Sequence, residues 1–134
     1  MPDRRYVSAL ATVLRGSALP YGYTVTVWTS GMMLTRHRGL PSTGEVFLFM
    51  LGAVAAYVSL GSVVRAGRGI PFDPAPGALR HTGMLHVIAV GGALGLATLV
   101  GLIPSFLAWP LGSFVATSSY LALATLELLL IGRR

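Results

Sequence analysis

Three long apolar stretches dominate this sequence and constrain its fold more than any other feature. They run from Val46 to Val64, from Gly83 to Ile103 and from Leu111 to Ile131. Each stretch has close to the 20 apolar residues that an α-helix needs to cross the hydrocarbon core of a bilayer. A helix also satisfies its own backbone hydrogen-bonding groups, which lipid cannot do. We therefore expect transmembrane helices at 46–64, 83–103 and 111–131.

A fourth apolar region, residues 6–34, is too long for one untilted span and is interrupted by Arg15 and Pro20. We interpret it as two elements: a short amphipathic helix at 3–15 that lies in the membrane interface, and a span at 18–35. Pro20 then falls in the first turn of the span, where no backbone hydrogen bond is lost. The alternative is one long tilted helix whose Arg15 side chain reaches back to the interface.

These elements predict an all-α fold. The chain is expected to be a polytopic membrane protein, a bundle of four transmembrane helices with a short amphipathic N-terminal helix, in a single membrane domain over 1–134. Hydrophobic residues make up 54% of the chain and charged residues 10%, whereas about a quarter of the residues in a soluble domain are charged. This composition argues against a soluble globular protein, a disordered chain and a nucleic-acid binder. Without Cys, the chain has no disulfide or thiolate chemistry.

The ten basic residues, all arginines, are distributed unequally between the two sides of this predicted topology. Only Arg36 and Arg38 fall on one side. The other side carries Arg4, Arg5, Arg15, Arg65, Arg68, Arg80, Arg133 and Arg134. Because cytoplasmic flanks carry the excess of basic residues, we expect a multi-pass protein of the cell (inner) membrane, in one orientation, with both termini cytoplasmic. The cytoplasmic arginines would contact anionic lipid headgroups.

A capping box precedes the second apolar stretch. Ser42 is followed three residues later by Glu45. In this motif the first side chain accepts a hydrogen bond from the backbone of the first helical turn, and the acidic side chain accepts one from the capping residue. We therefore expect Ser42 to begin the second helix.

Two ionisable residues, His86 and Glu127, lie inside the predicted spans. Such groups are costly in lipid and often functional. Both fall near the cytoplasmic ends of antiparallel neighbouring helices, so they could face each other at the inner mouth of a pathway. Alternatively, both side chains simply reach to the inner interface.

Hydroxyl side chains recur along the first span. Thr26, Thr29 and Ser30 are spaced as on a helix, with Trp28 among them. Hydroxyls in membrane helices bond their own carbonyls, bond a neighbouring helix or line a pore. We mark these four residues as candidates for a pathway or solute contact; the alternatives are helix packing for the hydroxyls and a lipid-facing or core position for Trp28.

Small residues are spaced four apart in three of the spans. The pairs are Gly52 with Ala56, Gly91 with Gly95, and Gly112 with Ala116. Because small residues at this spacing let helix backbones approach closely, we expect helix packing at these positions. The contacts could lie within one subunit or between subunits, and a homo-oligomer is expected.

Enzyme motifs are absent from the sequence, and the histidines and acids show no metal-ligand spacing. We expect no enzyme activity, no cofactor and no metal. The first functional hypothesis is a homo-oligomeric channel or small transporter for a small polar solute or ion. The alternative is a non-catalytic membrane subunit that binds a larger membrane complex or lipid.

Overall fold

The computed structural model describes residues 4–66 and 82–132 of the 134-residue chain, and within these ranges the side chains of 20–60, 62, 87–127 and 130. Four helices occupy the two ranges, which contain no strand, so the predicted all-α class is confirmed. The helices are α1 (Arg4–Arg38), α2 (Thr43–Ala66), α3 (Thr82–Gly101) and α4 (Ala108–Gly132).

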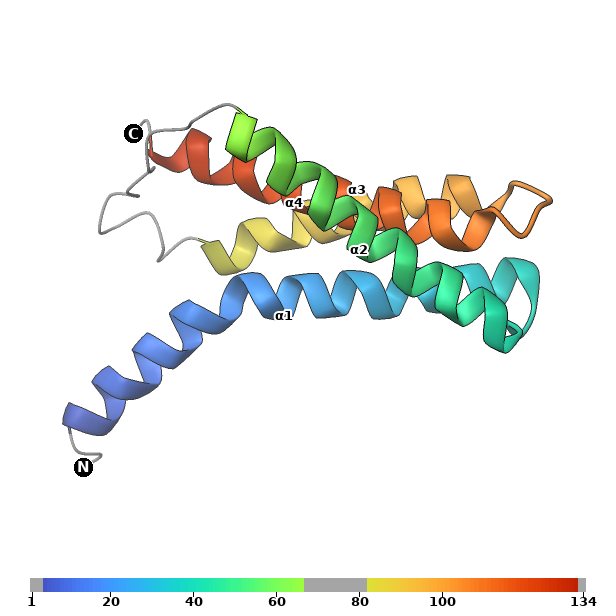
Figure 1. Ribbon diagram of the computed structural model, residues 1–134. Helices are drawn as coiled ribbons and strands as arrows, with labels where there is room; N and C mark the ends of the chain where they lie inside the picture. The colour runs from blue at the N-terminus through green and yellow to red at the C-terminus, as the bar shows by residue number, and fades with distance from the viewer. Residues whose placement is uncertain (1–3, 67–81, 133–134) are drawn as a thin grey trace.

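Helix α1 is continuous where the sequence suggested two segments. It runs for 35 residues with Pro20 inside it, and no break separates 15 from 18. Figure 1 shows the N-terminal part of α1, in blue, turned away from the axis of the rest of the helix. A proline in a helix interior lacks the N–H for the backbone bond and bends the helix instead of ending it. The predicted interfacial location of 3–15 stays a prediction.

A short turn joins α1 to α2. Gly39 follows the last residue of α1 with φ +83°, and its N–H donates to the Thr35 carbonyl over 2.8 Å, as expected of a glycine that ends a helix. The Ser42 N–H donates to Glu45 Oε2 over 2.7 Å, and the Glu45 N–H donates to Ser42 Oγ over 3.3 Å. These bonds form the expected capping box at the start of α2.

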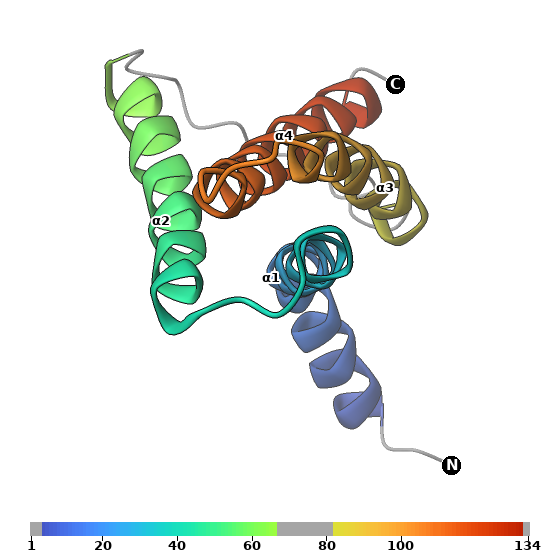
Figure 2. The same ribbon diagram turned by 90° about the vertical axis from the view of Figure 1, so that its right-hand side faces the viewer.

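Helix α4 is the centre of the bundle. Among the described residues it packs extensively against α1, α2 and α3, and the one other extensive pair is α1 with α3. Figure 2 shows α2 on one side of α4 and α3 on the other, with α1 below them. Helices α1 and α2 diverge on leaving their short turn, and the rings of Tyr23 and Tyr57 meet between them at a centroid distance of 5.2 Å.

Small residues bring the helices close together. A Cβ added to Gly52 would collide with Pro110 O and Ser113 Oγ of α4, and one added to Gly112 would lie 2.8 Å from Leu34 Cδ1 of α1. The core consists largely of alanines, which permit the same close approach. Its fully or nearly fully buried alanines are Ala53, Ala56, Ala89, Ala93, Ala97, Ala108, Ala116 and Ala124.

One described helix is long and apolar enough to cross a membrane. The stretch is Thr43–Leu60 of α2, with a mean hydropathy of 1.7 and only 17% of its residues buried. Helix α3 contributes a shorter apolar stretch, Val87–Gly101. Large apolar side chains also face outward over much of the bundle. The structure therefore supports one candidate span directly, and the expected four-span membrane bundle is taken up below as a proposal.

Candidate functional site

Four hydroxyl residues on α1 and α4 are buried in the bundle, and one of them, Ser113, faces Gly52 of α2. Thr26 and Ser30 belong to α1, Ser113 and Thr117 to α4, and each is fully buried. All four lie in sequence between two close contacts of these antiparallel helices, Gly22 with Tyr120 and Gly112 with Leu34. We call these four residues the hydroxyl layer.

Most of these hydroxyls bond to their own helix. Thr26 Oγ1 donates to the Gly22 carbonyl over 2.8 Å, Ser30 Oγ to the Val27 carbonyl over 2.9 Å and Ser113 Oγ to the Pro110 carbonyl over 3.1 Å. Among the described residues, Thr117 Oγ1 is buried with no hydrogen-bond partner. Hydroxyls bonded in this way cover polar atoms inside an apolar contact, as in membrane helix packing.

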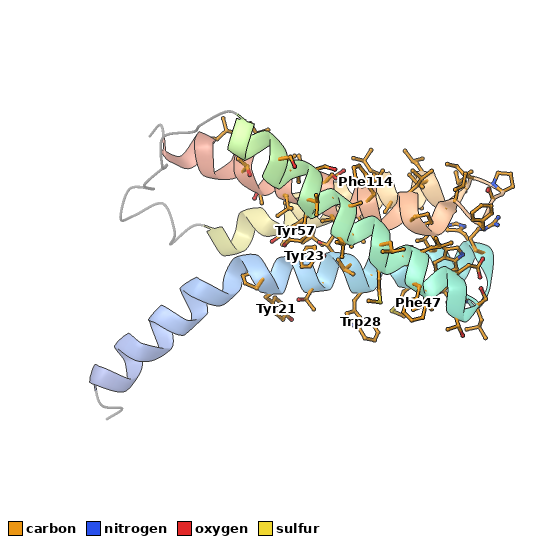
Figure 3. All side chains as sticks on the ribbon, in the orientation of Figure 1. Tyr21, Tyr23, Trp28, Phe47, Tyr57 and Phe114 are labelled. Atoms are coloured by element: carbon orange, nitrogen blue, oxygen red, sulfur yellow. The ribbon has the colours of Figure 1, made fainter. Side chains whose placement is uncertain are left out.

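The other two predicted pathway residues lie apart from the hydroxyl layer. Trp28 is 71% exposed on α1, and Figure 3 shows its side chain extending outward from the bundle. Thr29 is half-buried. Of the predicted pathway residues, the structure thus buries Thr26 and Ser30 inside the bundle and leaves Trp28 on its outside.

An apolar groove opens on the outside of the bundle, where α1 and α2 diverge. Its volume is about 440 Å³. Trp109 of α4, 3% exposed, forms part of its wall and packs edge-on against the ring of Phe49 with centroids 6.5 Å apart. The full lining is Val27, Trp28, Gly31, Met32, Thr35, Pro41, Val46, Phe49 and Trp109. We call this feature the α1–α2 groove.

Charged residues lie at the end of the α1–α2 groove nearest the turn. Arg36 and Arg38 are exposed in the last turn of α1. Residues three, four and seven apart share a helix face, so Arg38 continues the face of Gly31 and Thr35. Arg36 lies four residues after Met32 and eight after Trp28, so it shares their side of α1, next to the face of Gly31 and Thr35. The Arg38 charge also acts on the Glu45 carboxylate.

The predicted ionisable pair is described in part. Glu127 of α4 is half-buried with its carboxylate oxygens buried, and it interacts electrostatically with Tyr120. The His86 side chain lies outside the described residues. Because Gly92 of α3 packs on Leu123 of the antiparallel α4, position 86 falls within about one helical turn of the level of Glu127. The predicted facing of the two side chains stays a prediction.

The predicted packing residues occupy two different environments. Gly52, Ala56 and Gly112 are buried at the contacts of α2, α4 and α1. Gly91 and Gly95 are exposed, and a Cβ added to either would meet nothing within 4 Å. On α3 it is Gly92, between them, that packs against α4.

Comparison with models of protein families, with curated proteins and with solved structures finds no match. Within the described ranges, no group of three or more His, Cys, Asp or Glu residues is placed to hold a metal ion.

The α1–α2 groove was missed by sequence reasoning. The residues of α1 that line the groove recur at helical spacing. In the sequence, however, Val27, Met32 and the other apolar residues cannot be distinguished from apolar residues that face the core. One signal was present: the Gly39–Pro41 turn is short, which fixes α1 and α2 as neighbours at one end.

Proposed function

We propose that this protein is a non-catalytic, multi-pass membrane subunit that acts by binding another membrane component at the outside of its helix bundle. All four helices lie across the bilayer in this proposal, with α2 as its best-supported span. The location is the cell membrane, and both termini lie in the cytoplasm.

The hydroxyl layer carries this proposal. Three of its four hydroxyls are bonded to backbone carbonyls of their own helices, and all four residues are fully buried. A solute pathway needs polar groups that remain available to the solute or to water. Because these hydroxyls are buried and mostly bonded to their own helices, they favour a role in helix packing. The surface available for binding is then the apolar exterior of the bundle, with the α1–α2 groove.

A channel or small transporter assembled between copies is the second candidate, and a different observation favours it. Gly91 and Gly95 leave an open face on α3, of a kind that lets a second helix approach closely. Any solute pathway in this candidate would lie between subunits.

Flux through reconstituted liposomes separates the two candidates. Liposomes containing the purified protein should pass protons, small ions and small polar solutes no faster than empty liposomes. The matched variants are Thr26→Val, which removes a hydroxyl of the layer, and Ser59→Val, which removes an exposed hydroxyl that also bonds its own helix, to the Ala55 carbonyl. Flux above the empty-liposome rate that falls in Thr26→Val and not in Ser59→Val would contradict the binding proposal.

Native mass spectrometry in mild detergent tests the second candidate directly. An oligomer that dissociates when Gly95 is replaced by Leu would support assembly between copies, because the leucine fills the open face of α3. A wild-type protein of monomer mass would remove this candidate.

A further inference from the structure

We propose that the α1–α2 groove holds one acyl chain of an anionic phospholipid whose phosphate is bound by Arg36 and Arg38. The inference rests on the membrane-binding function proposed above and names the bound component. It depends on three observations: the lining of the groove, its depth and the charges at its mouth.

The lining suits a hydrocarbon chain. Apart from Thr35, whose hydroxyl is already bonded to the Gly31 carbonyl over 2.9 Å, the side chains that line the groove are apolar or aromatic. Gly31 leaves the middle of the α1 wall without a side chain, and a Cβ placed there would reach the Phe49 ring at 3.6 Å. At Gly31 the Phe49 ring of α2 therefore lies close to the α1 backbone.

The depth of the groove matches one leaflet. From Val27 to Thr35 the α1 wall extends about 12 Å at 1.5 Å per residue. The hydrocarbon core of a bilayer is about 30 Å thick, so one leaflet supplies roughly 15 Å. A chain that enters from the turn end would thus be covered over most of its leaflet. Tyr23, one turn before Val27 on α1, contacts Tyr57 of α2 with ring centroids 5.2 Å apart.

The charge at the mouth selects the headgroup. Arg36 and Arg38 lie within one turn of α1 after Thr35, the last α1 residue that lines the groove. In the proposed arrangement, the headgroup region of that leaflet begins at this level. His37 lies on the other side of the helix, its ring 3.7 Å from a Cβ built on Gly101 of α3. Glu45, which Arg38 attracts, is the acidic group at this end among the described residues. Two arginines against one carboxylate leave one net positive charge, which fits an anionic phosphodiester.

The only two tryptophans of the chain make the proposal measurable, because both line the groove. Lipids with brominated chains quench tryptophan fluorescence on contact. Trp28 is exposed on the outer edge of the groove and would meet bulk lipid in any case. The variant Trp28→Phe leaves Trp109, which is almost fully buried, as the reporter of a chain inside the groove.

The experiment uses the full chain carrying Trp28→Phe in vesicles of unbrominated phosphatidylcholine. Either brominated phosphatidylglycerol or brominated phosphatidylcholine is then added at equal mole fractions. We expect Trp109 to be quenched at lower mole fractions of phosphatidylglycerol. The expected relative affinity is about fivefold, the ratio that about 1 kcal/mol gives for the one net positive charge at the mouth of the groove. Arg36→Gln combined with Arg38→Gln should remove this preference. The matched control, Arg4→Gln with Arg5→Gln, should keep it.

Blocking the groove is the second arm. Gly31→Leu places a side chain in the middle of the groove and leaves both arginines in place, so quenching of Trp109 should fall for both lipids. Circular dichroism establishes that each variant is folded. If Trp28→Phe is misfolded, the same comparison is made on the total fluorescence of the wild type and Gly31→Leu, where only the Trp109 component should change.

Three results would overturn the inference. Equal quenching by the two lipids would show no headgroup selection. Absence of quenching by either would mean that no acyl chain enters, as when a protein segment or a second copy fills the groove. Unchanged quenching in Gly31→Leu would place the chain elsewhere. The proposed function fails separately, and visibly, if the protein does not float with the vesicles, since that outcome removes the membrane location itself.

Discussion

At Gly52 the backbone of α2 lies against the central helix. A Cβ there would collide with the Pro110 carbonyl oxygen and with Ser113 Oγ, and a backbone atom cannot move aside as the end of a flexible side chain can. We expect Gly52→Ala to lower the free energy of unfolding by about 1–3 kcal/mol, the usual cost of overpacking, as measured by thermal unfolding in detergent.

Gly95→Ala is the matched control for this prediction. Its Cβ would meet nothing within 4 Å, and alanine favours a helix interior over glycine by about 0.5–1 kcal/mol. The Gly95 variant should therefore be as stable as the parent or more so. Equal destabilisation by both substitutions would mean that helix contact is not the reason.

The residue scale also shows the limits of sequence reasoning. The spacing of small residues four positions apart identified Gly52 and Gly112, which lie at helix contacts. The same spacing identified Gly91 and Gly95, which are exposed. The apolar residues of α2, α3 and α4 are distributed around every face of each helix. No polar face therefore indicates which side of the helix turns inward. Which glycines are buried depends on the partner helix, and that information is distributed over the whole chain.

At the scale of the element, helix ends follow from local chemistry. The start of α2 was predictable because Ser42 and Glu45 satisfy each other's backbone groups. Helix α1 was harder to divide because a proline in the interior of an apolar helix bends it without ending it. Its real end, at Gly39, uses a positive φ.

Removing the cap tests this local control. Ser42→Ala loses the side-chain oxygen that accepts from the Glu45 N–H, and it should lower the free energy of unfolding by about 1 kcal/mol. Thr43→Ala, one residue later and exposed, should change it by less than about 0.5 kcal/mol. Chemical denaturation of both variants in the same detergent measures the difference, and an equal loss in the two would rule out capping as the cause.

At the scale of the whole molecule, the arginines are separated by the fold. Figure 1 places the start of α1 and the ends of α2 and α4 at one end of the bundle, and the α1–α2 turn at the other. Arg36 and Arg38 are at the turn end, whereas Arg4 and Arg5 are at the opposite end. The proposed topology requires this separation, since it assigns the two ends of the bundle to opposite sides of the membrane, and the cytoplasmic termini stay a proposal.

Reporter fusions test the topology. A reporter that is active only in the cytoplasm should give signal when fused after Arg134 and none when inserted at Gly39 in the α1–α2 turn. A reporter active only outside the cytoplasm should give the reverse pattern. Signal of the same kind at both positions would contradict three membrane crossings by α2, α3 and α4, the helices that lie between Gly39 and Arg134.

The central position of α4 has a consequence for how the chain is made. Helix α4 is the last of the four to leave the ribosome, since synthesis runs from the N-terminus. Until it emerges, α1 and α3 can pair, but α2 lacks the helix it packs on. Helix α2, with only 17% of its apolar segment buried in the finished bundle, therefore stays without its main packing partner until α4 has been made, and the bundle can close only then.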